Sequence, residues 1–183
     1  MTAVLVLADN ADLAGVNAWL DLHGEPVEDV ARGHSELACR RVAAIDGTEA
    51  ALLDDHVGDV RYVSLRGPRA AAWASELART FACESPSALL SALRDDVEPR
   101  RWIRALSKLA VLRPAHAESA WLTAWSSALA HPHRAVRRAA IRTCYGARWP
   151  ELLALAERRI TEDHELSGPL AQLCEHLARD DDE

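Results

Sequence analysis

The spacing of hydrophobic and polar positions in the first part of the chain predicts a mixture of strands and helices. The apolar run at 3–8 predicts a buried strand, and β-type runs at 37–45 and 60–65 predict two more. Apolar residues three and four positions apart at 12–22 and 69–81 predict two amphipathic helices. We therefore expect a small α/β domain, which the pattern extends to residue 84.

Two segments of this first part are harder to interpret. Residues 48–55 are compatible with a short helix or with a strand, and the pattern does not decide between them. Pro26, shortly after His23-Gly24, is a stop signal for the preceding helix.

From residue 87 onward the spacing is helical throughout. Pro, Gly and paired Asp residues interrupt it at intervals that suit short helix–helix connections. We expect an all-α domain over 87–180, made of three antiparallel helix pairs and followed by an acidic tail at 180–183. The predicted helices are 87–94, 99–112, 118–130, 134–145, 150–161 and 169–179.

The second helix of each pair repeats the same apolar stripe at a period of 34 residues. Trp102 falls on Val136 and then on Leu170 when the chain is shifted by this period. The other aligned positions, spaced 3, 4 and 7 residues further along, are Ala105, Ala139 and Leu173; Leu106, Ala140 and Cys174; and Leu109, Thr143 and Leu177. Such spacing is typical of the buried side of an amphipathic helix.

The segment Leu129–Ile141 resembles the turn and second helix of a HEAT repeat, with a Pro-containing turn, then Val-Arg, then Ala-Ala. The first unit keeps an acidic turn at 95–96 but has Trp102 in place of Val, and the last unit, around 163–169, diverges further. This resemblance implies a HEAT-like α-solenoid, which presents surfaces to other macromolecules. The expected fold class is an α+β two-part chain with a HEAT-like helical half.

The 34-residue shift also aligns two rows of basic residues, each on one face of a second helix. Their members are Arg100, Arg104 and Lys108, and Arg134, Arg138 and Arg142. The third unit has Gly168, Gln172 and His176 instead. The rows are either a surface for an acidic partner or a solvated helix face.

Composition changes this picture by dividing the charge between the two parts. The chain has 183 residues, 49% of them hydrophobic, and a net charge of −7. Residues 1–86 hold 14 acids and 7 arginines, whereas 87–183 hold 14 acids and 14 bases, so the acidic surplus belongs to the first part. The apolar content excludes wholesale disorder, and net acidity argues against a protein that coats nucleic acid with its whole surface.

Cysteine usage and hydropathy indicate the compartment. The four cysteines form no C-x-x-C pair, which suggests buried thiols in a reducing compartment. No apolar run approaches the roughly 20 residues of a membrane span, and the first residues lack the basic flank of a signal peptide. We expect a cytoplasmic protein, and the excess of Arg over Lys suggests a GC-rich bacterial genome.

Candidate chemistry is sparse. His131 and His133 lack a third and fourth ligand nearby, so a turn is favoured over a metal site. Asp54-Asp55-His56 is better explained as a polar turn than as an acid/base pair. The pairs Cys39 with His34 and Cys144 with His131 lack a nucleophile signature, no phosphate-binding loop is present, and Arg66-Gly67-Pro68 is a weak anion-site candidate. We expect no catalytic residues, no metal and no cofactor.

Trp121 and Trp125 share one face of the helix at 118–130. They are candidates either for the core or for aromatic anchors that bind a partner.

Three functions compete. The first is a non-enzymatic interaction protein, an adaptor, scaffold or immunity-type inhibitor that binds another protein or a second copy of itself. The second is nucleic-acid binding through the basic rows, by analogy with HEAT-like DNA alkylation-repair glycosylases. The third is an enzyme with its site in the first part or at the seam between the two parts.

Overall fold

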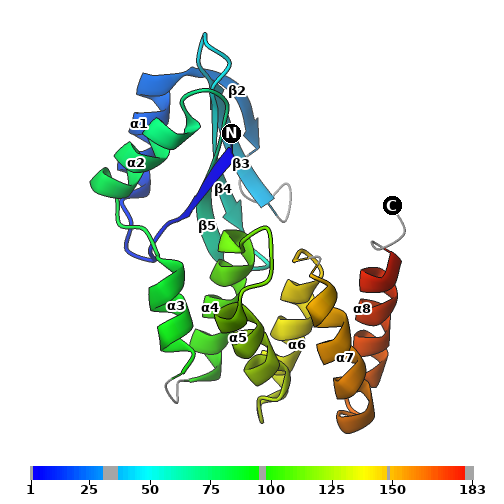
Figure 1. Cartoon of the computed structure of the whole chain (residues 1–183). Coiled ribbons are helices and arrows are strands. Elements are labelled where there is room, and N and C mark those ends of the chain that lie inside the picture. Colours follow the sequence, from blue (N-terminus) through cyan, green and yellow to red (C-terminus); the bar gives the residue numbers. More distant parts are fainter. Residues whose placement is uncertain (1, 31–36, 95–97, 148, 180–183) are drawn as a thin grey trace. The chain divides into compact units, whose positions relative to one another are not determined.

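The computed structural model describes residues 2–30, 37–94, 98–147 and 149–179 and divides the chain into two compact units between Ser85 and Pro86 (Figure 1). All the described strands belong to the first unit, and the regular elements among the described residues of the second unit are helices. The predicted α+β organisation with a helical C-terminal part is therefore confirmed. The tail at 180–183, the acidic turn at 95–96 and His34 lie outside the described residues.

The first unit is built on a five-stranded sheet in which every neighbouring pair is antiparallel. The strand order is β1-β5-β4-β3-β2, so β1 and β2 form the two edges. The strands are β1 (Thr2–Val6), β2 (Glu25–Val30), β3 (Leu37–Ala43), β4 (Glu49–Asp55) and β5 (Val60–Arg66).

The sequence left strand β4 undecided and did not predict strand β2. The undecided segment 48–55 is strand β4, which pairs along its whole length with β3 and β5. Strand β2 was not predicted, because Pro26 breaks the run and most of its side chains are exposed. A proline is tolerated there because an edge strand has one side without partner strands.

Helices α1 (Leu13–His23) and α2 (Ala70–Thr80) cover one face of the sheet (Figure 1). The Asp12 carboxylate caps α1 by accepting a hydrogen bond of 3.0 Å from the amide of Gly15. The core between helices and sheet includes Trp19 and Trp73, whose rings meet edge to face. The first unit is thus a two-layer structure with its own core.

The turn from β5 into α2 depends on Gly67. Its φ is +112°, a backbone conformation that L side chains rarely adopt. An added Cβ would lie 2.8 Å from both the carbonyl oxygen of Gly47 and the Cα of Thr48. The Thr48 hydroxyl accepts a hydrogen bond of 3.2 Å from the backbone amide of Arg69. One of the amides at the start of α2 is therefore already bonded to a side chain.

Substitution of Gly67 by alanine is expected to destabilise the first unit by about 1–3 kcal/mol, because both the backbone angle and the contact with residues 47–48 become strained. Urea unfolding followed by circular dichroism measures the effect. Gly168→Ala is the matched control, since an added Cβ there meets nothing within 4 Å. Equal stabilities of the two variants would contradict this account of the turn.

In the second unit the described residues form six helices. They are α3 (Pro86–Ala92), α4 (Pro99–Leu112), α5 (Ser119–Leu129), α6 (Arg134–Cys144), α7 (Pro150–Glu162) and α8 (Ser167–Arg179). Pro99 and Pro150 open α4 and α7 at the helix position where a missing amide costs nothing. Helix α5 contacts both α3 and α7, and these three helices form one layer. Helix α6 contacts both α4 and α8, and these three form the other layer, so the three helix pairs stack side by side.

The positions aligned by the 34-residue shift lie in the core of this stack. In α4, α6 and α8, eleven of the twelve side chains are buried, and Cys174 is partly buried. The apolar stripe therefore marks the inward side of each second helix.

The described helices include none that is both long and apolar enough to cross a membrane.

Candidate functional site

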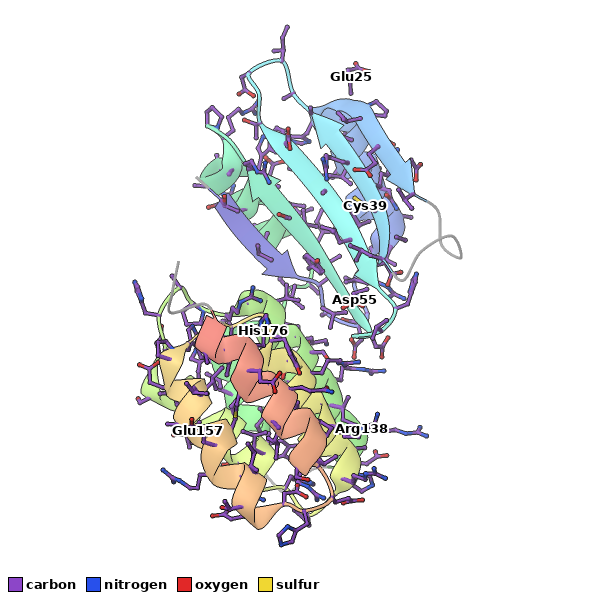
Figure 2. The ribbon with its side chains drawn as sticks, turned by 90° about the vertical axis from the view of Figure 1, so that its right-hand side faces the viewer. Glu25, Cys39, Asp55, Arg138, Glu157 and His176 are labelled. Carbon is purple, nitrogen blue, oxygen red and sulfur yellow. The ribbon has the colours of Figure 1, made fainter. Side chains whose placement is uncertain are left out.

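The basic rows lie on two helices that pack directly against each other, α4 and α6. Arg100 and Arg104 on α4, and Arg138 and Arg142 on α6, are exposed. Figure 2 shows the Arg138 side chain extending away from α6. Arginines from two neighbouring helices thus contribute to the solvent-accessible surface of this unit.

Three members of the rows have surroundings that differ from those of the other exposed arginines. Lys108 is only 4% exposed, so it adds no accessible charge, and we correct its assignment to a partner-binding surface. The Arg134 guanidinium pairs with Glu165 at 2.9 Å and remains exposed. The Arg142 guanidinium donates to the Ser107 hydroxyl at 3.3 Å, which connects α6 to α4. We call Arg100, Arg104, Arg134, Arg138 and Arg142 the basic surface.

Arg137, which the sequence analysis did not single out, holds this part of the stack together. Its Nε donates to Asp163 at 2.6 Å, and one Nη donates to Glu165 at 2.6 Å. Its other Nη donates to the carbonyls of His131 and Pro132, at 3.0 and 2.9 Å. Arg137 therefore links the α5–α6 turn to the α7–α8 turn.

A signal for this residue was present in the sequence. Arg137 follows Val136 in the HEAT-like segment, and Asp163 and Glu165 lie in the turn before the next second helix, α8. The position of Arg137 on the helix is the signal, because Arg134 and Arg138 lie opposite the apolar stripe, whereas Arg137 borders it.

Trp121 and Trp125 are buried in the core of the helical unit. Their rings stack at a centroid distance of 5.8 Å, and Trp149 meets both edge to face at 6.0 and 6.1 Å. The Trp125 indole N–H donates to the Thr143 hydroxyl at 3.2 Å. Because neither ring reaches the surface, we correct their assignment as partner-binding anchors and place them in the core.

His131 and His133 form the turn before α6. The Nδ1 atom of His131 accepts the amide of His133 at 3.0 Å, and the Nδ1 atom of His133 accepts the amide of Ala135 at 3.2 Å. Both imidazoles thus serve as caps of backbone amides. In the described part of the chain, no group of three or more His, Cys, Asp or Glu residues is placed to hold a metal ion.

Asp54, Asp55 and His56 belong to the end of β4 and its turn into β5. Asp55 accepts the amides of Val57 and Gly58 at 2.9 and 2.8 Å, which makes it a turn residue. His56 Nδ1 lies 3.6 Å from the Asp54 carboxylate, which Arg61 approaches to 3.4 Å. Figure 2 labels Asp55 at this end of the hairpin.

The cysteines have the surroundings of structural thiols. Burial raises the pKa of all four, Cys39, Cys83, Cys144 and Cys174, above the usual value. The effect is largest for Cys144, which is fully buried on α6. A raised pKa leaves less thiolate at neutral pH, so these residues are poor nucleophiles.

A groove opens between α3 and α5, with a volume of about 640 Å³. We call it the α3–α5 groove. It combines an apolar wall with hydroxyl groups, one arginine and one histidine. Its lining residues are Leu90, Leu93, Arg94, Trp102, Ser119, Ala120, Thr123, Ala124, Ser127, Ala130, His131 and Pro132.

Comparison of the chain with protein-family models, with curated proteins and with solved structures finds no match.

Proposed function

We propose that the chain is a non-enzymatic protein–protein interaction module that binds an acidic partner protein through its HEAT-like helical unit. The observation that carries the proposal is the basic surface, in which arginines from the neighbouring helices α4 and α6 are exposed together. An adaptor, a scaffold or an immunity-type inhibitor in the cytoplasm fits this description. The acidic first unit makes a second copy of the chain a further candidate partner.

Rigidity supports the proposal. The links from Arg142 to Ser107 and from Arg137 to Asp163 connect α6 to α4 and to the α7–α8 turn. Side chains on a preorganised scaffold lose less conformational entropy on binding than side chains on a mobile loop. Complementary charge also speeds association and suppresses partners of the wrong charge.

Charge reversal at the basic surface is expected to weaken partner binding by about tenfold or more, because like charges then face each other across the interface. The variant is Arg100→Glu combined with Arg138→Glu. Both positions are exposed, and a glutamate in the first turn of α4 is favourable to the helix dipole. The measurement is quantitative mass spectrometry of proteins that co-purify with the full chain from native lysate, together with sedimentation velocity for self-association.

Arg158→Glu is the matched control, since Arg158 is an exposed arginine on α7, outside the basic surface. Nuclease treatment and a mobility-shift assay at two salt concentrations separate a protein partner from a nucleic acid. Equal partner recovery by the double variant and the control would rule out the basic surface. A nuclease-sensitive complex would favour the nucleic-acid alternative.

A further inference from the structure

Strand β1 turns a row of backbone groups away from the rest of the sheet. It lies at one edge, and β5 is its neighbour among the described strands (Figure 2). The Leu7 amide, directly after β1, donates to the carbonyl of Arg61 on β5 at 2.9 Å. Because backbone groups of successive residues alternate between the two sides of a strand, the amides and carbonyls of Thr2 and Val4 point away from β5.

The segment that follows α2 covers only one end of this edge. The Ala8 amide donates to the Ala82 carbonyl at 3.0 Å, and the Glu84 amide donates to the Val6 carbonyl at 2.8 Å. The part of the edge that can accept a further strand is therefore Thr2–Leu5. Strand β1 contains no charged residue and no proline, the two features that commonly prevent strand addition at a sheet edge.

Helix α2 presents a row of alanines beside the same edge. It contacts β1 and β5, whereas α1 contacts β3, so α1 lies on the side of α2 that is remote from β1. The Trp19 indole of α1 donates to the carboxylate of Glu76 at 2.8 Å, which marks that side of α2. Ala71, Ala74 and Ala78 lie roughly 140–160° around the helix from Glu76, on the side toward the β1 edge.

The spacing of strands and helices suits a second copy of the chain at this edge. If β1 pairs with the β1 strand of another copy, the two strands are about 4.8 Å apart. Helix α2 lies over β1 and β5, so a two-fold axis between the strands sets the two α2 helices about 10 Å apart, or two strand spacings. Packed helices are about 8–10 Å apart, and the exposed Ala71 and Ala78 leave room for this approach.

We infer that the chain forms a homodimer in which two β1 strands pair antiparallel and join the two sheets into one, with the α2 helices side by side. Thr2 pairs with Val4 of the second copy, and the two residues exchange both N–H···O bonds. This register uses the outward backbone groups of both residues and stops short of the segment at 82–84. The dimer involves the first unit alone, so it goes beyond the proposed function of the helical unit.

Sedimentation velocity of the full chain without an added amino-terminal tag, over a series of concentrations, tests the inference. The expected result is a monomer–dimer equilibrium. Val4→Pro removes an amide that points away from β5, so the pairing of β1 with β5 is kept and the dissociation constant of the dimer rises about tenfold or more. Ala78→Glu places bulk and like charges between the two α2 helices and is expected to have a similar effect.

Ala72→Glu is the matched control for Ala78→Glu. Both alanines are exposed on α2, but Ala72 lies about 40° from Glu76, on the side toward α1. The control is expected to dimerise like the unmodified chain, and circular dichroism checks the fold of each variant. Absence of a dimer at every concentration, or equal dissociation constants for the two glutamate variants, would each overturn the inference.

Hydrogen exchange tests the strand pairing without a substitution. Exchange of the Val4 amide is expected to slow as the protein concentration rises, because the dimer gives this amide an acceptor. A Val4 exchange rate that does not change with concentration would overturn the proposed pairing.

The basic-surface variant, Arg100→Glu with Arg138→Glu, separates this inference from the proposed function. The inference expects that variant to dimerise like the unmodified chain. A dimer that is lost in the basic-surface variant but retained by Val4→Pro and Ala78→Glu would overturn the inference and leave the proposed function standing.

Discussion

Replacement of Arg137 by leucine is expected to lower the free energy of unfolding by about 3–5 kcal/mol, because it removes the partner of a buried carboxylate. Asp163 is 8% exposed, and the Arg137 guanidinium bonds it at 2.6 Å. The same guanidinium also satisfies the carbonyls of His131 and Pro132. Without this guanidinium, the Asp163 carboxylate loses its paired charge, and the carbonyls of His131 and Pro132 lose a hydrogen-bond donor.

Chemical unfolding of the full chain, followed by far-ultraviolet circular dichroism, measures this loss. Arg138→Leu is the control, since the neighbouring arginine is exposed and such a substitution changes stability by about 0.5 kcal/mol or less. Combining Arg137→Leu with Asp163→Asn is expected to restore part of the stability. The asparagine side chain carries no charge, and its oxygen still accepts a hydrogen bond from the backbone N–H of Leu166. Equal stabilities of Arg137→Leu and Arg138→Leu would contradict the role of Arg137.

Replacement of Trp125 by alanine is expected to destabilise the helical unit by about 3–5 kcal/mol, the cost of a large cavity in a close-packed core. The side chain is fully buried and contacts the rings of Trp121 and Trp149. Its indole N–H also donates to the hydroxyl of Thr143 at 3.2 Å.

The contrast with Trp125→Phe tests the same packing. Phenylalanine keeps most of the apolar volume but loses the bond to Thr143, so we expect a smaller loss of about 1–2 kcal/mol. Thermal unfolding of both variants measures the difference. A stability change near zero for Trp125→Ala would mean that the indole is not a core residue, as the partner-binding interpretation required.

The helices were predictable because local signals mark their ends. Pro99 and Pro150 occupy the first positions of α4 and α7, and Asp12 stands at the cap of α1. The 34-residue register of apolar positions was also visible, since each second helix must turn the same side toward the core. Periodicity therefore identified the elements of the helical unit.

Strand β2 was not predictable in the same way. The sequence Glu-Pro-Val-Glu-Asp-Val has no alternation of apolar and polar residues, because no face of this edge strand is deeply buried. Antiparallel pairing with β3 holds this strand in the sheet, and the register of the pairing shifts between Pro26 and Glu28. Pairing of this kind depends on tertiary contacts, which a local pattern does not contain.

The candidate site was predictable in part. A shift of the sequence aligned the basic residues of α4 and α6, but it gave Lys108 the same status as Arg100, although Lys108 is buried. It also passed over Arg137, whose partners lie 26 and 28 residues further along the chain. Position on a helix face sets the direction of a side chain, and only the neighbouring helices decide whether that direction leads to solvent.

The edge formed by β2 has a consequence for the behaviour of the protein at high concentration. An exposed edge strand invites a strand from another molecule, which is a route to fibrous aggregates. Here an incoming strand meets Pro26, which has no amide to donate, and the exposed carboxylates of Glu25 and Asp29. Two β2 edges therefore repel each other, so the acidity of this strand disfavours the addition of further strands at this edge of the sheet.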